Sequence, residues 1–222
     1  MSRLYLSAPL PFVGQKRMFA RPFLEIVSRY PDGTVFVDLF GGSGLLSHIA
    51  RHTHPGSRVV YNDYDGYRRR LDNIPRTNRL LSLIRPVADR FPRHQAITGE
   101  SRERIFSLLE QEEREAGYLD FITLSSSLLF SMKYRTSIAG MREQTLYNNV
   151  RKGDYPACPG YLDGLEIVSM DYRELFERHK DTPGVVFIVD PPYLSTEVGT
   201  YRMSWRCSRG MISSISRRRS RA

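Results

Sequence analysis

The clearest pattern in the chain is a mostly apolar run at residues 35–40 that leads into a four-residue turn with three glycines. Apolar side chains then recur at helical spacing over residues 45–50, until a Pro-Gly pair stops the segment. A second apolar run, residues 58–62, follows and ends at Asp63. The order strand, turn, helix, strand predicts a βαβ unit and therefore a parallel sheet.

From about residue 75 to residue 160 the pattern becomes mainly helical. Residues 100–115 form the clearest predicted helix, because their apolar side chains share one face, and Gly117 is expected to end it. The acidic side chains of this helix are expected to form a solvated surface: Glu110, Glu112, Glu113 and Glu115.

The α/β pattern resumes after this insertion, with a strand expected at 165–168, a helix at 172–179 and a fully apolar strand at 185–189. The expected fold is therefore α/β, with a sheet interrupted by a mainly helical insertion. Four parts are expected: 1–74, the first half of the catalytic domain; 75–160, the insertion; 161–202, the later strands; and 203–222, a disordered tail.

Composition narrows the class of protein. The 222 residues include 41% hydrophobic side chains, enough for a sizeable core, so general disorder is excluded. Apolar runs fall far short of the ~20 residues that cross a bilayer, and the first 18 residues lack a signal-peptide pattern, so a cytoplasmic protein is expected. Two cysteines and unclustered histidines predict neither a disulfide scaffold nor a metal site.

The glycine turn predicts a nucleoside site. Gly42 and Gly44 would let backbone N–H groups approach a ligand, and Asp63, at the end of the next strand, could accept hydrogen bonds from ribose hydroxyls. Ser47 stands where a dinucleotide fingerprint has its third glycine, which disfavours a pyrophosphate-bearing cofactor and hence a nucleotide-dependent oxidoreductase. The alternative is a structural turn in which Asp63 only caps a helix.

Asp190, Pro191, Pro192 and Tyr193 follow the strand at 185–189 and are the stronger signal. A nucleobase amine is a poor nucleophile because its lone pair is delocalised into the ring. The Asp190 carboxylate and the Pro191 carbonyl could accept its two N–H protons and free that lone pair, while the prolines fix the direction of the carbonyl. Tyr193 could stack on a base flipped out of a duplex.

Five motifs in this order resemble the Dam-type family of DNA adenine-N6 methyltransferases. They are residues 11–16 (Pro-Phe-Val-Gly-Gln-Lys), 38–44, 61–63, 170–172 and 190–193. The resemblance covers roughly residues 5–200, and it departs from the family at Gln15, where the family usually has glycine. It implies S-adenosylmethionine as the methyl donor, double-stranded DNA as the substrate, and a Rossmann-like methyltransferase sheet with a target-recognition insertion.

The resemblance also implies roles for individual residues. Those expected at the donor site are Phe12, Lys16, Asp38, Phe40, Gly42, Gly44, Asp63, Asp171 and Asp190. Those expected to act on the target adenine are Asp190, Pro191, Pro192 and Tyr193.

Basic side chains in the second half of the insertion alternate with aromatic and amide residues, a mixture suited to phosphates and bases. The expected DNA contacts are Lys133, Arg135, Arg142, Arg151 and Lys152, with a solvated basic face as the alternative. The protein is expected to act as a monomer.

The overall charge of +9 is concentrated at the end of the chain. Residues 200–222 hold seven Arg and no acid, so the first 199 residues carry only 9 − 7 = +2. Such a tail is not expected to pack, although a methyltransferase sheet should continue there. We therefore expect a chain shortened or frame-shifted beyond about Trp205, or else a natural tail that binds nucleic acid. The competing function is a non-catalytic DNA-binding remnant.

Overall fold

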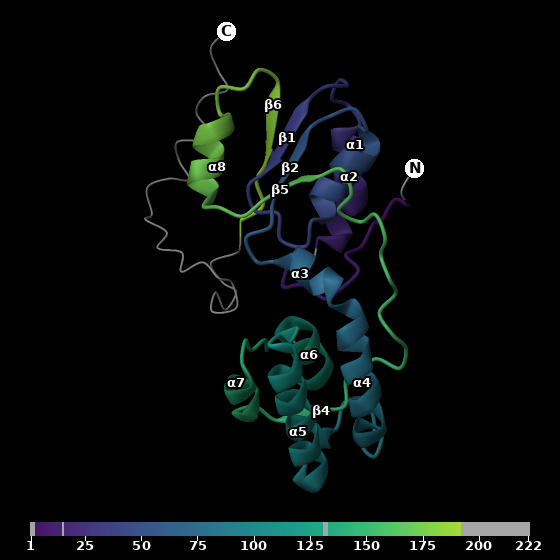
Figure 1. The fold of residues 1–222 in the computed structure, drawn as a ribbon. Helices are drawn as coiled ribbons and strands as arrows, with labels where there is room; N and C mark the ends of the chain where they lie inside the picture. Colours follow the sequence, from purple (N-terminus) through teal and green to yellow (C-terminus); the bar gives the residue numbers. More distant parts are fainter. Residues whose placement is uncertain (1–2, 15, 131–132, 192–222) are drawn as a thin grey trace. The chain divides into compact units, whose positions relative to one another are not determined.

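The structure is a computed structural model that describes residues 3–14, 16–130 and 133–191, all within the unit Met1–Pro191. Its main sheet has four parallel strands in the order β5-β2-β1-β6 (Figure 1). The strands are β1 Val35–Asp38, β2 Val59–Asn62, β5 Glu166–Val168 and β6 Val185–Ile188. The predicted α/β class and parallel sheet are confirmed. The strands expected at 58–62, 165–168 and 185–189 are found to within one residue at either end, whereas the apolar run at 35–40 is a strand only as far as Asp38.

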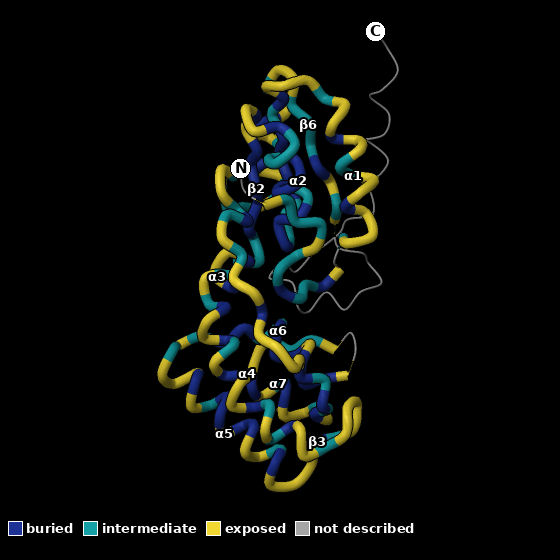
Figure 2. Tube along the Cα trace, turned by 90° about the vertical axis from the view of Figure 1, so that its right-hand side faces the viewer, coloured by how far each residue is buried: buried dark blue, intermediate teal, exposed yellow. Residues whose placement is uncertain are grey.

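Helices cover both faces of this sheet because alternate residues of each strand are apolar on opposite sides. Phe36 of β1 packs with α1 (Ala20–Val27) and α2 (Leu45–Thr53), whereas the next residue, Val37, packs with α8 (Tyr172–His179). A short 3-10 helix, η1 (Arg17–Phe19), precedes α1. Burial is deepest in β2, where all four residues are buried (Figure 2).

The segment between β2 and β5 is mainly helical, as predicted. Its helices are α3 Tyr67–Asp72, α4 Ile74–Ala88, α5 Gly99–Ala116, α6 Phe121–Leu128 and α7 Ile138–Arg142. Two short strands, β3 (Ala96–Ile97) and β4 (Leu146–Tyr147), pair antiparallel within it, which the sequence did not predict. Gly117 ends α5 with a φ of 61°, as expected.

The expectation that the acidic side of α5 is solvated was wrong for Glu112, whose residue is only 7% exposed. Its carboxylate accepts a hydrogen bond from Arg76 Nε at 3.0 Å and another from Arg79 Nη2 at 2.7 Å, both from α4. Long arginines on a neighbouring helix compensate the buried charge, and helical spacing on α5 alone could not show this.

Candidate active site

The glycine turn and Asp190 lie at one edge of the sheet. Asp38, the last residue of β1, is paired in register with Ile188, the last residue of β6, two positions before Asp190. The turn at residues 41–44 follows β1 directly. Ligands of open parallel sheets bind beyond the carboxyl ends of the strands, so this edge is the candidate site.

Lys16 reaches this edge from the N-terminal segment. Its Nζ lies 2.8 Å from Asp190 Oδ1, and the two side chains are 18% and 26% exposed. Both groups therefore keep a path to solvent or ligand, while the ammonium compensates the charge of the carboxylate. This ion pair joins the motif at residues 11–16 to the motif at residues 190–193. The sequence assigned both motifs to one family pattern but did not show that they are in contact.

Asp38 is a buried carboxyl beside this pair, only 1% exposed. Ser47 Oγ donates to its Oδ2 at 2.7 Å, and Phe40 N donates to its Oδ1 at 3.3 Å. Burial nevertheless raises the pKa of Asp38 from 3.8 to about 7, with a smaller contribution from the negative charge of Asp190. Asp38 thus joins the residues on either side of the glycine turn through hydrogen bonds. Ser47 has a structural function that the sequence did not reveal.

The raised pKa of Asp38 predicts a pH-dependent stability. Between pH 3.8 and about 7 the folded state holds a proton on Asp38 that the unfolded chain has released. Rising pH in this window should lower the free energy of unfolding, by about 4 kcal/mol in total, with no further change from this group above it. Denaturant titrations of Asp38→Asn should therefore show a flatter profile than the wild type between pH 5 and pH 7. Parallel profiles for the two proteins would contradict the raised pKa.

Glycines shape the turn because there is no room for side chains. Gly42 and Gly44 have φ values of 52° and 72°. A Cβ on Gly42 would lie 3.0 Å from the ring of Phe12, and one on Gly41 would lie 2.2 Å from the buried ring of Tyr61. The backbone of the turn therefore lies directly against two aromatic rings, and α2 begins immediately after it.

Asp63 is engaged by the chain itself. Its Oδ1 accepts hydrogen bonds from Tyr61 Oη at 3.0 Å and from Tyr67 N at 2.5 Å, and its Oδ2 accepts one from Arg68 N at 3.0 Å. The carboxylate thus caps the start of α3, the alternative role considered from the sequence. Only Oδ2 keeps a lone pair for a further donor, so a ribose contact stays a prediction.

Asn62 connects the ends of three strands, and the sequence analysis gave it no individual role. It is 2% exposed, and its Nδ2 donates to Leu39 O at 3.1 Å and to Met170 O at 2.9 Å. Met170 N donates back to Asn62 Oδ1 at 3.1 Å. A buried amide at a strand end was the available signal, because such a group must find partners on neighbouring loops.

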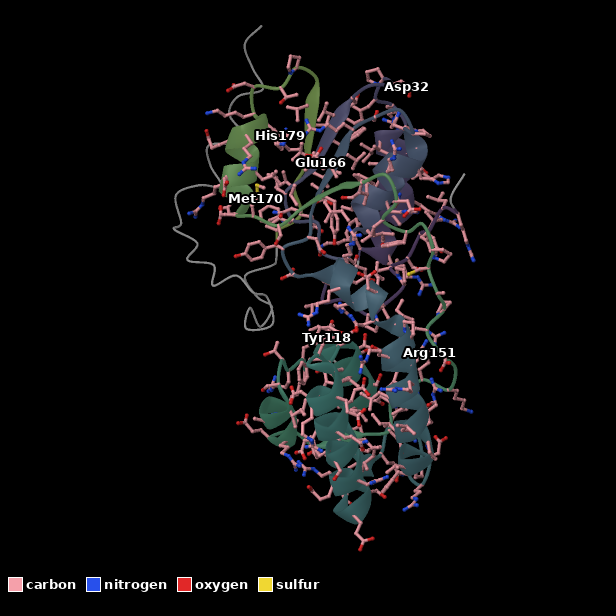
Figure 3. The ribbon with its side chains drawn as sticks, in the orientation of Figure 1. Asp32, Tyr118, Arg151, Glu166, Met170 and His179 are labelled. Atoms are coloured by element: carbon pink, nitrogen blue, oxygen red, sulfur yellow. The ribbon has the colours of Figure 1, made fainter. Side chains whose placement is uncertain are left out.

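The aromatic and acidic side chains around Met170 complete this side of the rim. The rings of Phe40 and Tyr172 lie 4.9 Å apart. Asp171 is exposed and accepts a hydrogen bond from Arg173 N at 2.8 Å, which caps α8. In Figure 3, Met170 is labelled just before the start of this helix and His179 at its last residue.

The chain that returns from the insertion also packs against the glycine turn. Tyr161 is 1% exposed, its Oη donates to Ser43 O at 3.1 Å, and its ring stacks on His48 of α2 at 4.9 Å. The pKa of His48 is lowered, mainly by burial. His48 and Tyr161 are therefore core residues that hold the turn, which agrees with the absence of a predicted role for the histidine.

Pro191 is exposed directly after Asp190. Pro192 and Tyr193, the other two residues predicted to act on the adenine, lie outside the described residues, as does the predicted tail at 203–222. The structure therefore describes Asp190 and Pro191 of this motif.

The five predicted DNA contacts differ in their surroundings. Lys133, Arg151 and Lys152 are exposed, and Arg151 lies 4.8 Å from the ring centre of Tyr155 (Figure 3). Arg135 is half-buried and its Nη1 donates to Tyr134 O at 2.8 Å. Arg142 is paired with Glu103 at 2.9 Å and with Glu110 at 2.8 Å, so its charge is already compensated within the protein.

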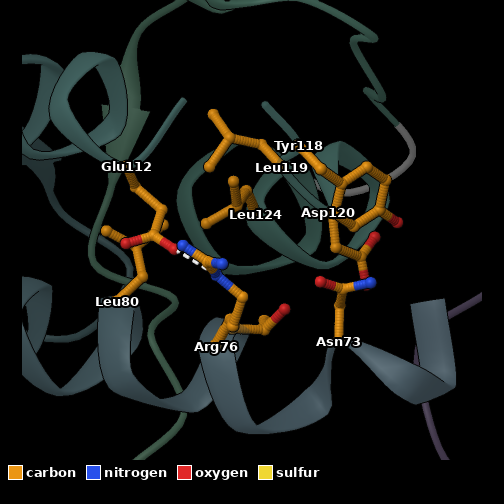
Figure 4. A pocket seen from close by; sticks show the side chains of 9 residues that line it. Asn73, Arg76, Leu80, Glu112, Tyr118, Leu119, Asp120 and Leu124 are labelled. Carbon is orange, nitrogen blue, oxygen red and sulfur yellow. Dashed lines mark hydrogen bonds and ion pairs between the residues drawn. The ribbon is translucent and has the colours of Figure 1, made fainter. Parts of the chain in front are cut away.

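A small pocket lies within the insertion, between α4 and the segment that joins α5 to α6 (Figure 4). The Arg76–Glu112 ion pair, Asn73, Tyr118 and Asp120 line it. The pocket has room for about one water molecule. We therefore assign no ligand site there.

Within residues 3–14, 16–130 and 133–191 there is no group of three or more His, Cys, Asp or Glu that could hold a metal ion. In the same residues, no helix has the length and apolar character needed to span a membrane.

The parallel sheet with helices on both faces is the fold of a Rossmann-like methyltransferase. Within this class, the family model for D12 class N6 adenine-specific DNA methyltransferases matches residues 12–210, and the chain belongs to that family. It is also 37% identical over 207 residues to a protein of Haemophilus influenzae whose name is "Putative methyltransferase". The aligned region covers 91% of this chain and 69% of that protein.

Proposed function

We propose that the protein transfers a methyl group from S-adenosylmethionine to the N6 amine of an adenine flipped out of double-stranded DNA. The observation that carries this proposal is the Lys16–Asp190 ion pair at the strand-end edge, beside the glycine turn. Family membership and the Haemophilus relative support methyl transfer in general. The donor, the flipped base and the residue roles are the finer parts of the proposal.

The residues at this edge fit a nucleoside-containing donor. Glycines at 41, 42 and 44 leave the turn with little side-chain bulk, so a ligand could approach its backbone and the start of α2 closely. The residues proposed to hold the donor are Phe12, Lys16, Asp38, Phe40, Gly42, Gly44, Asp63, Asp171 and Asp190. When bound, S-adenosylmethionine would supply a methyl group whose carbon is a strong electrophile, because it is attached to a positively charged sulfur.

Asp190 and Pro191 would act on the amine. The Asp190 carboxylate and the Pro191 carbonyl accept its two N–H protons, which draws the nitrogen toward tetrahedral geometry and frees its lone pair for attack. Lys16 holds the carboxylate in place at 2.8 Å. The amine nitrogen would gain a bond to the methyl carbon as the bond from that carbon to the sulfonium sulfur breaks, with the electron pair staying on the sulfur as a neutral thioether. The nitrogen would then release one proton through Asp190. The rest of the catalysis is positioning, because both reactants are held in line at one edge.

The proposed DNA contacts give a prediction about salt. If Lys133 and Lys152 each neutralise a phosphate, Lys133→Gln or Lys152→Gln should flatten the slope of log K against log salt by about 0.9. Arg142→Gln should change the slope less, because Glu103 and Glu110 already compensate Arg142. Fluorescence anisotropy with a labelled duplex at several salt concentrations measures these slopes. Unchanged slopes for both lysine variants would remove them from the interface.

A radiolabel assay tests the proposed function as a whole. The protein is incubated with S-adenosylmethionine that carries a labelled methyl group and with duplex DNA of mixed sequence. Label retained in the DNA supports the proposal. Tight DNA binding without label transfer would favour a binding protein without catalysis.

A further inference from the structure

Arg70 of α3 lies outside every predicted site, yet it connects three segments that are distant in sequence. The residue is 5% exposed. Its Nε donates to Asp120 Oδ1 at 2.9 Å, and its Nη2 donates to Pro11 O at 2.6 Å and to Thr123 Oγ1 at 3.2 Å. One guanidinium thus joins the N-terminal segment, α3 and the start of α6.

On the insertion side of this contact, burial and hydrogen bonds fix the position of Asp120. The side chain of Asp120 is 1% exposed. The same carboxylate caps α6, since it accepts hydrogen bonds from Thr123 N at 3.1 Å and from Thr123 Oγ1 at 2.6 Å. Asp120 therefore cannot turn away from Arg70 without uncapping the helix.

At its other end, α3 holds the start of the segment that leads to Lys16. Leu10 N donates to Tyr67 Oη at 3.0 Å, next to the bond from Arg70 to Pro11 O. Phe12 follows at once, with its ring 5.7 Å from that of Tyr67 and close to Gly42. Four residues further on, Lys16 contacts Asp190. The direction of the chain at Pro11 thus decides where Phe12 and Lys16 can lie.

We infer that Arg70 is a positioning residue that makes the placement of Phe12 and Lys16 at the donor side of the site depend on Asp120 of the insertion. The inference rests on the proposed function. A planar guanidinium can donate to Asp120 and Pro11 at the same time and in fixed directions, whereas a lysine ammonium is a single point on a flexible stem. Arg70→Lys should therefore keep the charge and lose the double contact.

Hydrogen exchange of the free protein tests the inference without any cofactor. In Arg70→Lys, the amides of residues 5–17, including Leu10 N, should exchange about tenfold faster, because a charge-assisted hydrogen bond that orders the segment is lost. Amides within α5 report global opening in the same sample and correct for it. Asp120→Asn should shift the same peptide in the same direction by a smaller factor, and it serves if Arg70→Lys does not fold.

Glu112→Gln is the matched control, because Glu112 is also a buried carboxylate of the insertion but is paired with Arg76 and Arg79 of α4 rather than with Arg70. It should leave residues 5–17 unchanged after correction for global opening. Equilibrium dialysis should show the dissociation constant for S-adenosylmethionine rising about tenfold in Arg70→Lys and less than about twofold in Glu112→Gln, with DNA affinity unchanged in both.

Unchanged exchange of residues 5–17 in both Arg70→Lys and Asp120→Asn would overturn the inference. So would faster exchange with an unaltered affinity for S-adenosylmethionine. Failure of the wild type to bind S-adenosylmethionine or to label DNA would instead contradict the proposed function, and the exchange result would still stand as a separate measurement.

Discussion

Asp190→Asn should lower the rate of methyl transfer about 10³-fold while the protein stays folded. The substitution preserves size but replaces a charged acceptor with an amide, one end of which donates and would oppose the N–H groups of the amine. It also removes the carboxylate charge that lies 2.8 Å from Lys16 Nζ. The measurement is the single-turnover rate of label transfer to duplex DNA, with folding checked by circular dichroism.

Asp181→Asn is the control for this prediction. Asp181 is exposed in the turn between α8 and β6, before the start of the strand, whereas Asp190 follows the end of the strand. Its substitution should leave the rate within about twofold of the wild type, as for most surface changes. A rate for Asp190→Asn close to that of the control would show that the carboxylate does not act on the amine.

Gly41→Ala should be the most damaging change to the donor side of the site. The new Cβ would lie 2.2 Å from the ring of Tyr61 and 2.7 Å from the backbone oxygen of Asn62. Tyr61 is fully buried and cannot swing away, so the turn itself must shift. We expect the free energy of unfolding to fall by about 3 kcal/mol. The melting temperature should fall by about 10 °C.

Gly56→Ala provides a matched comparison for this effect. Gly56 is exposed at the end of the α2 segment, and a Cβ there would meet nothing within 4 Å. Its melting temperature should stay within about 2 °C of the wild type. Equal melting temperatures for the two variants would mean that the turn is looser than its packing indicates.

The sheet was predictable because its information is local. Uninterrupted apolar strands followed by glycine or acidic residues identify buried parallel strands whatever their partners, and β1, β2 and β6 were found in this way. The short strands β3 and β4 were not, since two residues carry no periodicity and their pairing depends on the fold of the insertion.

The site was predictable only as far as motifs extend. Glycines and Asp190 could be placed at one edge from the order of the strands, but the 2.8 Å contact between Lys16 and Asp190 joins segments far apart in sequence. Ser47 and Arg70 act through buried hydrogen bonds to other elements, and a polar side chain at such a position has no distinctive local pattern. Asn62 differs because its place at the end of a strand was a signal.

The most direct test of the proposed reaction is the identity of the methylated atom. Duplex DNA is incubated with the wild-type protein and S-adenosylmethionine, digested to nucleosides and analysed by mass spectrometry beside synthetic standards. We predict N6-methyldeoxyadenosine as the methylated product with the wild type and its loss with Asp190→Asn. Methylation of cytosine, or N6-methyladenine formed equally by both proteins, would contradict it.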